Sequence, residues 1–134
     1  MITGIGIDII EVERIAEKIS KEQGFRELVF SGNEISYCEA ATHKFEHYAA
    51  RFAAKEAFFK AIGTGWTNGT AFNEIEIIQD EKGKPVLKLT GITASTLKDK
   101  GIGTISVSLS HVKTMATAVV IIECAFRSDG DVRP

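Results

Sequence analysis

The chain has 134 residues, of which 44% are hydrophobic, so it is long enough to bury the core of one ordinary domain. Its net charge of −2 at pH 7 gives no reason to expect a nucleic-acid or membrane-surface partner. The two cysteines, Cys38 and Cys124, form neither a CxxC pair nor a disulfide framework, and no apolar run reaches the length of a transmembrane helix. We therefore expect one soluble, cytoplasmic domain with reduced thiols and no structural zinc.

Residues 2–10 predict a β-strand, because β-branched side chains alternate there with small ones. The alternation places three isoleucines on one face and Gly4, Gly6 and Asp8 on the other. Asp8 is therefore a lone carboxylate on a face cleared of side chains. An Asp near a strand end most often caps the following helix. The glycines, however, indicate that a ligand or phosphate approaches the backbone closely.

Residues 12–24 predict an amphipathic helix with its apolar residues along one side. The opposite side carries a basic stripe that an aromatic residue extends, and this stripe consists of Arg14, Lys18, Lys21 and Phe25. Such a stripe is either an ordinary solvated face or a docking surface for an acidic partner, with Phe25 as an exposed aromatic anchor.

A weak helical stretch over residues 33–41 precedes the strongest helix of the sequence, residues 45–62. Glu56 falls in the middle of an apolar stripe on this helix. A buried carboxylate needs a cation, a proton or a metal. An ion pair with Lys60, one turn later, is the simplest solution. The two isolated carboxylates Asp8 and Glu56 would alternatively suit a hard cation with oxygen ligands.

The loop after this helix is rich in glycine, with Gly63, Gly65 and Gly69, and it follows Lys60 directly. Backbone N–H groups in such a loop can bind a phosphate. Glycines after a helix more often only cap it, and the GxxxxGK[ST] spacing of a P-loop is absent. The loop is therefore a candidate phosphate site only in combination with other residues.

The second half of the chain predicts antiparallel strands. Residues 72–79 alternate as a strand, and EKGKP at 81–85 forms the turn that leads into the short strand VLKLT. A short helix over residues 93–101 precedes two further strands, GTISVSLSH and TMATAVVIIE.

These elements together predict one α+β domain, residues 1–126, in which a mainly antiparallel sheet packs on a long central helix. Residues 127–134 predict a polar C-terminal tail. No repeat, linker or low-complexity block divides the chain, so we expect one folding unit.

Three motifs, in order along nearly the whole chain, resemble the holo-acyl-carrier-protein synthases, a family of 4'-phosphopantetheinyl transferases. They are GIGIDIIEVERI, RFAAKEAFFKAIGTG and SLSHVKTMATAVV, and EKGKP resembles the family's turn between the last two. The resemblance implies an α+β homotrimer with sites between subunits. It also implies Mg²⁺-dependent transfer of phosphopantetheine from coenzyme A to a serine of acyl-carrier protein, in fatty acid biosynthesis. The basic stripe would bind this acidic, helical carrier.

By this resemblance, Asp8 and Glu56 are the Mg²⁺ ligands and Lys60 lies at the pyrophosphate of coenzyme A, so these are the expected catalytic residues. The metal would make the phosphate more electrophilic, and Lys60 would offset the charge that develops on its oxygens. The attacking serine needs a proton acceptor, which is either Glu56 or a metal-bound water that Glu56 orients.

Five further residues are candidates for binding coenzyme A. Gly63 and Gly65 belong to the loop described above. His111 lies near coenzyme A by the resemblance, although a lone His after a strand more often has a structural role. Lys44 and Arg51 flank the start of the main helix. They either hold the 3'-phosphate of coenzyme A or belong to a solvated helix face.

Two other classes of function fit parts of the sequence. HKFEH matches the inverted zinc-protease motif H-x-x-E-H, in which His43 and His47 would bind Zn²⁺ beside Glu46 as general base. Chance matches to so short a pattern are common, and no other motif supports a protease. A non-catalytic module that only docks the carrier protein would need neither Asp8 nor Glu56.

Overall fold

The structure is a computed structural model that describes residues 1–65 and 67–125. The predicted tail at 127–134 lies outside the described residues. The elements in chain order are β1 (Ile2–Glu11), α1 (Val12–Lys21), α2 (Phe25–Val29), α3 (Gly32–Ala40), α4 (Lys44–Ile62), η1 (Phe72–Glu74), β2 (Ile75–Gln79), β3 (Pro85–Leu89), α5 (Gly91–Thr96), η2 (Lys98–Lys100), β4 (Ile102–His111) and β5 (Met115–Cys124). None of the described helices combines the length and the apolar character that a membrane span requires.

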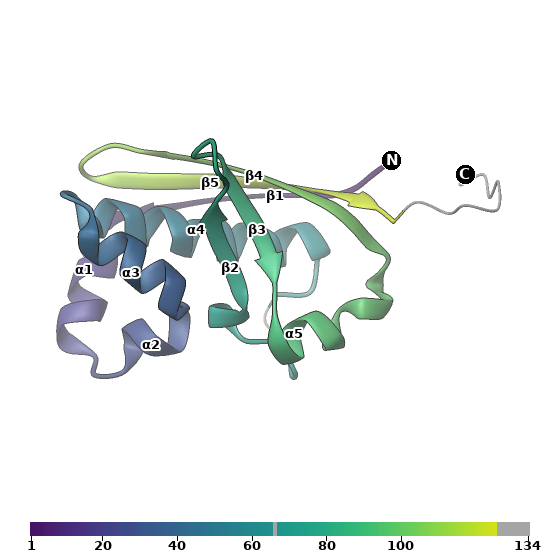
Figure 1. Ribbon diagram of the computed structural model, residues 1–134, viewed down its shortest axis with the longest axis horizontal. Coiled ribbons are helices and arrows are strands. Elements are labelled where there is room, and N and C mark those ends of the chain that lie inside the picture. The colour runs from purple at the N-terminus through teal and green to yellow at the C-terminus, as the bar shows by residue number, and fades with distance from the viewer. Residues whose placement is uncertain (66, 126–134) are drawn as a thin grey trace.

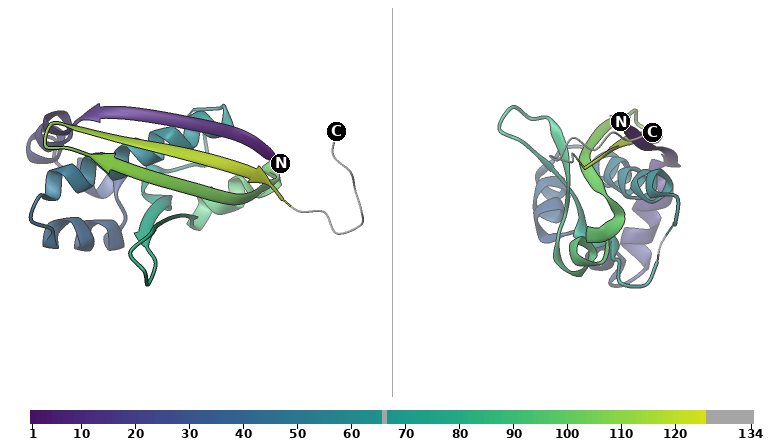
Figure 2. Two further views of the ribbon diagram at one scale, coloured as in Figure 1. Left: turned by 90° about the horizontal axis from the view of Figure 1, so that it is seen from above. Right: turned by 90° about the vertical axis from the view of Figure 1, so that its right-hand side faces the viewer.

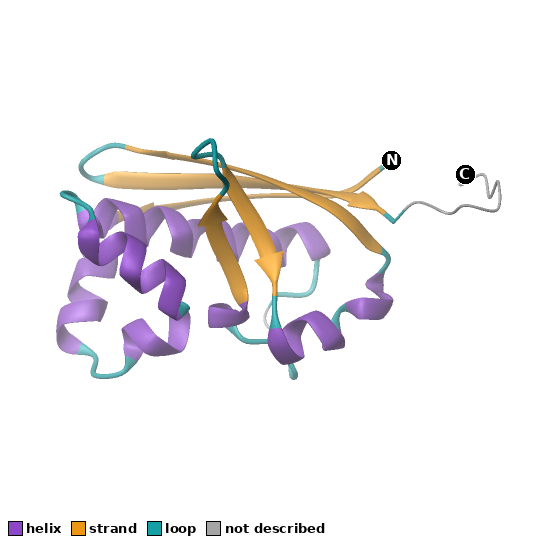
Figure 3. Cartoon of the chain, in the orientation of Figure 1, coloured by secondary structure: helices purple, strands orange, loops and turns teal. Residues whose placement is uncertain are grey.

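The main sheet has three antiparallel strands in the order β1-β5-β4, and α4 packs along one of its faces (Figure 1). Helices α1, α2 and α3 gather at one end of α4, whereas α5 and η2 lie toward the other end (Figure 3). The hairpin of β2 and β3 forms a second, two-stranded sheet that projects from the side of the domain (Figure 2). The predicted α+β class, with antiparallel sheets and a long central helix, is confirmed.

Three predicted elements have different bounds in the structure. The helix predicted over residues 12–24 ends already at Lys21, and Gly24, with a left-handed φ of 86°, precedes the separate helix α2 that begins at Phe25. The strand predicted from residue 72 is preceded by the short 3-10 helix η1 and begins only with β2. The helix predicted over residues 93–101 divides into α5 and η2.

Strand β1 packs directly on the backbone of α4 through two glycines. A Cβ atom at Gly4 would overlap the carbonyl oxygen of Ala61, and a Cβ atom at Gly6 would overlap that of Ala57. Main-chain atoms of a packed helix cannot move aside as the end of a flexible side chain can. The prediction that a ligand or phosphate approaches these glycines is therefore wrong, because the group that approaches them is α4.

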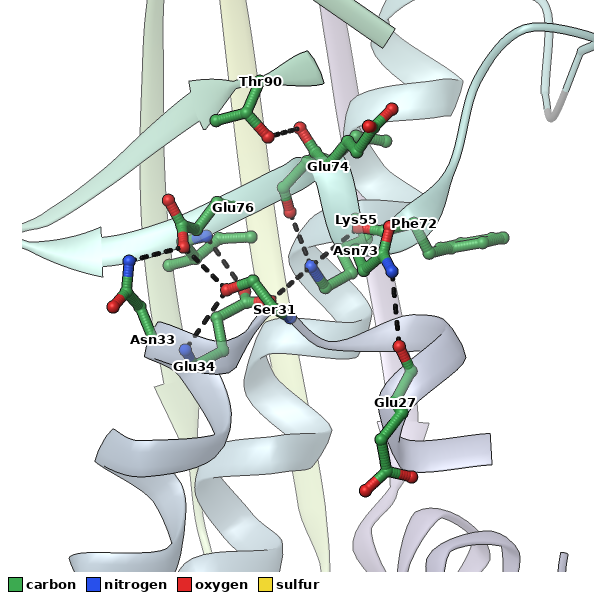
Figure 4. Close-up of polar contacts among 12 residues, drawn as sticks. Glu27, Ser31, Asn33, Glu34, Lys55, Phe72, Asn73, Glu74, Glu76 and Thr90 are labelled. Carbon is green, nitrogen blue, oxygen red and sulfur yellow. Dashed lines mark hydrogen bonds and ion pairs between the residues drawn. The ribbon is translucent and has the colours of Figure 1, made fainter. Parts of the chain in front are cut away.

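A buried ion pair joins α4 to α3 and to the start of β2 (Figure 4). The ammonium of Lys55 lies 2.8 Å from Oε1 of Glu34 and also donates to the carbonyl oxygens of Phe72 and Ile75. Glu34 Oε2 accepts the N–H of Ile77 at 2.9 Å. Burial lowers the pKa of Lys55, whereas the charge of Glu34 opposes this effect. Nothing in the sequence pattern predicts this pair, which joins the segment from Phe72 to Ile77 to α3 and α4.

We expect Gly6→Ala to lower the free energy of unfolding by about 2 to 3 kcal/mol, because the new methyl group must push β1 away from α4. Gly32→Ala is the matched control, since a Cβ atom there meets no atom within 4 Å and the backbone φ is not positive. Chemical denaturation of both variants measures the difference. Equal stability of the two variants would contradict the close-packing argument.

Candidate active site

Asp8 is brought to α4 by the packing of β1. It follows Gly6 by two residues and therefore lies on the same, helix-facing side of the strand. Lys60 Nζ lies 3.0 Å from Asp8 Oδ1, and it also donates to the carbonyl oxygen of Ile7 at 3.0 Å. The side chain of Asp8 is 16% exposed and that of Lys60 is 56% exposed. The ion pair thus lies where the strand and helix meet solvent.

Glu56 is half-buried on α4, one turn before Lys60. Within residues 1–65 and 67–125 it makes no hydrogen bond or ion pair, so Lys60 pairs with Asp8 instead of with Glu56. Burial is the main cause that raises the pKa of Glu56, the charge of Asp8 raises it further, and Lys60 lowers it. Glu56 is therefore a half-buried carboxylate without a hydrogen-bond or ion-pair partner among the described residues.

The two carboxylates open into a hollow of about 200 Å³ between β1, α1 and α4. Its lining comprises Asp8, Ile9, Ile10, Arg14, Ile15, Lys18, Phe52 and Glu56. No group of three or more His, Cys, Asp or Glu ligands occurs in the described part of the chain. The donor set nevertheless fits Mg²⁺, which commonly takes one or two carboxylates and completes its shell with substrate phosphates and water.

His111 and Arg51 lie in a second group of side chains, formed by α3, α4 and the end of β4. His111 Nδ1 is 2.8 Å from Glu46 Oε1, and the His111 ring meets the ring of His47 edge-on at 5.1 Å. His47 in turn meets the ring of Tyr37 at 5.6 Å, and the guanidinium of Arg51 lies 4.3 Å from the centre of that ring. The sequence pattern did not predict Tyr37 or the packing of His47 against two rings, although His47 lies one turn before Arg51 on the same helix.

Arg51 is only 2% exposed, so the alternative that it belongs to a solvated helix face is wrong. Its Nε is buried, and the guanidinium makes no hydrogen bond or ion pair with any described residue. Burial is the main cause that lowers the pKa of His47, and its neighbours His111 and Arg51 lower it further. Arg51 is thus a buried cation without a carboxylate partner among the described residues, which suits an anionic ligand.

The remaining candidates for binding coenzyme A lie at the two ends of α4. Lys44, at the N-terminal end, pairs with Glu39 at 3.3 Å and lines a hollow of about 380 Å³. Gly63, at the C-terminal end, has a φ of 80° and caps the helix, with its N–H bonded to the carbonyl oxygen of Phe59. Gly65 is exposed in the loop that follows. A role of either glycine in ligand binding stays a prediction.

The predicted basic stripe divides between two places. Arg14 and Lys18 line the hollow beside Asp8, whereas Lys21 lines a separate hollow of about 660 Å³. Phe25 is partly buried against the core, and Lys18 Nζ lies 5.6 Å from its ring centre. The prediction that Phe25 is an exposed anchor is wrong. The chain turns at Gly24, and Phe25 begins the new helix α2 with its ring packed against the core.

The zinc-protease match does not form a metal site among the residues that the structure describes. His43 is 72% exposed, and its Nδ1 lies 3.9 Å from Glu46. His47 instead packs against the rings of Tyr37 and His111. No described group of three or more potential ligands includes these histidines, so the motif is a chance match.

We expect Glu56→Gln to stabilise the metal-free protein. Because burial raises the pKa of Glu56 above its ordinary value of 4.5, the ionised carboxylate costs free energy in the folded state at neutral pH. Removing that charge should raise the melting temperature on the order of a few degrees. The gain should shrink as the pH falls and vanish well below 4.5, where the carboxyl is protonated in both the folded and the unfolded state. Glu17→Gln, on the exposed face of α1, is the control. A lower or unchanged melting temperature at neutral pH would contradict the claim that the ionised Glu56 destabilises the metal-free protein.

Comparison with known proteins agrees with this geometry. A family model described as the 4'-phosphopantetheinyl transferase superfamily matches residues 4–117. A holo-[acyl-carrier-protein] synthase of Cytophaga hutchinsonii is 47% identical over 123 residues, which are 90% of this chain and 97% of that protein. The crystal structure of the Neisseria meningitidis synthase has a TM-score of 0.83 and 35% identity, and the match covers 92% of this chain and 99% of that one.

The Bacillus anthracis synthase, whose crystal structure is a complex with CoA (3',5'-ADP), has a TM-score of 0.76 and 37% identity, with 93% of this chain and 99% of that chain covered. Sequence and structure thus agree over most of the chain, including the β1 and α4 segments that hold Asp8 and Glu56 together. The chain belongs to the holo-[acyl-carrier-protein] synthase family of the 4'-phosphopantetheinyl transferase superfamily.

Proposed function

We propose that this protein transfers 4'-phosphopantetheine from coenzyme A to a serine of apo acyl-carrier protein, which yields holo carrier and adenosine 3',5'-bisphosphate. The observation that carries the proposal is the pair of carboxylates, Asp8 and Glu56, held over one hollow with Lys60 beside them. Relatives named as holo-[acyl-carrier-protein] synthases over nearly their whole length support it. We also place the reaction in the cytoplasm, where it would supply holo carrier for fatty acid biosynthesis.

Asp8 and Glu56 would hold Mg²⁺ together with the pyrophosphate of coenzyme A and water. When bound, the metal neutralises charge on the pyrophosphate and makes the phosphorus more electrophilic. Lys60 holds Asp8 in place and offsets charge that develops on the phosphoryl oxygens. The donor set on β1 and α4 therefore supplies two anionic ligands and one cation for a single phosphate group.

In the reaction, the serine oxygen of the carrier attacks the phosphorus that bears the pantetheine arm. A new P–O bond forms to serine, and the bond from that phosphorus to the bridging oxygen breaks, so that its electron pair leaves on adenosine 3',5'-bisphosphate. Glu56 accepts the serine proton, either directly or through a water that it orients.

The second group of side chains would bind the 3'-phosphate of coenzyme A. Arg51 offers a buried guanidinium without a counter-ion in the described residues, and His111 offers a ring nitrogen that makes no hydrogen bond there. Lys44 would add a more exposed positive charge at the start of α4. Gly63 and Gly65 would approach the pyrophosphate from the loop after Lys60.

Mass spectrometry of an apo acyl-carrier protein, incubated with this protein, coenzyme A and Mg²⁺, tests the function. We expect a mass gain of one phosphopantetheine per carrier. Asp8→Ala and Glu56→Gln should each slow the transfer by about two to four orders of magnitude, because each removes a charged metal ligand. Glu81→Gln, in the exposed turn between β2 and β3, should transfer normally. Near-normal transfer by both site variants at moderate Mg²⁺ would contradict the assignment of Asp8 and Glu56 as metal ligands. The absence of a mass gain with the unaltered protein would contradict the proposed transfer reaction.

The carrier is proposed to dock on α1 and α2 beside the hollow that holds Asp8. Arg14 and Lys18 line this hollow, so a partner bound there would bring its serine close to the metal ligands. Leu28 on α2 is 71% exposed and supplies the apolar contact that Phe25 does not. An acidic helical carrier complements this combination of charge and apolar surface.

We expect the double change Arg14→Glu and Lys21→Glu to raise the KM for carrier protein by about tenfold and to flatten its salt dependence, because complementary charge mainly speeds encounter. The matched control reverses two exposed lysines of η2, Lys98→Glu and Lys100→Glu, at the far end of the domain. If the carrier KM stays the same, or the control changes it equally, the docking face lies elsewhere.

The outer face of the main sheet is proposed to form a homotrimer interface, with active sites between subunits. Ile5, Ile7 and Ile9 of β1 are each more than 60% exposed. Ile5 and Ile7 pair in register with Ile121 and Val119 of β5, which extend the same apolar face. So flat an apolar surface is unusual on a soluble monomer.

We expect Ile7→Glu to convert a trimer into monomers, because three copies would bring the new charges together in a buried interface. Ile92→Glu on α5 is the control, since Ile92 is 68% exposed but lies away from the sheet face. Sedimentation velocity distinguishes the species. A fully active monomer of the unaltered protein at assay concentration would overturn the trimer.

A further inference from the structure

Glu46 holds His111 across two elements that are far apart in the sequence. It lies in the first turn of α4, and its Oε1 is 2.8 Å from Nδ1 of His111 at the end of β4. The side chain of Glu46 is only 16% exposed, whereas that of His111 is 31% exposed. Glu46 Oε2 also lies 3.9 Å from Nδ1 of His43. The carboxylate is therefore shielded and directed at His111 at hydrogen-bond distance.

The contacts of His111 fix both the position and the orientation of its ring. Nδ1 meets Glu46, and the ring packs edge-on against His47, with an angle of 63° between the ring planes. His47 is itself held by the ring of Tyr37, at an angle of 77°. Nε2 of His111 makes no hydrogen bond with any described residue. One nitrogen is thus occupied and the other is available to a ligand.

A buried cation of the same side-chain group favours an anionic ligand. Arg51, on the ring of Tyr37, has no carboxylate partner among the described residues, and the carboxylate of Glu46 is engaged with His111. A carboxylate that accepts a hydrogen bond from one imidazole nitrogen orients the ring. It also stabilises the protonated form of the ring, in which both nitrogens carry a hydrogen. In that state Nε2 donates, as a phosphate oxygen requires.

We propose that Glu46 is a positioning residue that acts on the binding of coenzyme A through His111. By holding Nδ1, Glu46 orients the ring so that Nε2–H of His111 can donate to the 3'-phosphate. This inference rests on the proposed placement of His111 at that phosphate. Glu46 itself touches no part of the ligand. Its effect is on the binding of coenzyme A, and the rate of the transfer step at saturating coenzyme A is unchanged.

Calorimetric titration with coenzyme A and with 3'-dephospho-coenzyme A tests the proposal in the full chain. We expect Glu46→Ala to weaken binding of coenzyme A by about tenfold, which is the lower range for loss of a residue that orients a ligand-binding His. Binding of the dephospho form should change by less than about twofold, since it lacks the group that His111 would meet. His43→Ala is the matched control, because it removes only the longer, exposed contact of Glu46.

The double variant Glu46→Ala with His111→Ala separates positioning from mere packing. If Glu46 acts through His111, the double variant binds coenzyme A no more weakly than His111→Ala alone. Additive losses, or equal losses for the two ligands, would overturn the proposal. So would a His111→Ala variant with unchanged affinity.

Nuclear magnetic resonance of ¹⁵N-labelled histidine gives a readout that needs no ligand. In the unaltered protein, Nδ1 of His111 should carry a hydrogen that it donates to Glu46. The fraction of His111 with a hydrogen on Nδ1 should fall in Glu46→Ala and should fall less in Glu46→Gln. Unchanged ¹⁵N shifts in Glu46→Ala would also overturn the proposal. Failure of the proposed transfer reaction is recognised separately, as absence of mass gain on the carrier with the unaltered protein.

Discussion

The backbone of β1 lies against the backbone of α4 because Gly4 and Gly6 carry no side chains. Any Cβ atom at either position would overlap a main-chain carbonyl of the helix, which packed helices cannot accommodate. This close approach sets Asp8 within hydrogen-bond distance of Lys60. It also places Glu56, one turn before Lys60, over the same hollow. The chemistry of the site therefore depends on a steric constraint that involves none of the reacting groups.

Each of the two sites along α4 holds a charged group without a partner of opposite charge among the described residues. Toward the C-terminal end, Lys60 pairs with Asp8, and the unpaired Glu56 has its pKa raised by burial and by the charge of Asp8. Toward the N-terminal end, Arg51 is buried without a counter-ion in the described residues, against the ring of Tyr37. Each unpaired charge costs stability in the ligand-free protein. A ligand that brings both a metal-bound pyrophosphate and a separate phosphate would relieve both, and coenzyme A has this composition.

Local sequence patterns predict much of this arrangement, because strand and helix periodicity assign each residue to a face. They place Asp8 on the same face of its strand as Gly4 and Gly6, put Glu56 on the apolar side of α4, and predict both hairpins. They do not predict that Lys60 pairs with Asp8, 52 residues away, because that choice depends on how β1 packs on the helix. They also misplace Phe25 and leave the burial of Arg51 open, since the turn between α1 and α2 and the packing of α3 on α4 decide these positions. Tertiary packing selects among partners that the sequence leaves equally available.

The most direct measurement is a crystal structure with coenzyme A and Mn²⁺ in place of Mg²⁺, in which anomalous scattering locates the metal. The proposed metal site predicts one anomalous peak, at a metal ion bound by the carboxylates of Asp8 and Glu56 and by an oxygen of the pyrophosphate. Lys60 should lie beside the phosphoryl oxygens. A metal bound to the pyrophosphate but to neither carboxylate would contradict it. So would a pyrophosphate bound outside the hollow between β1, α1 and α4.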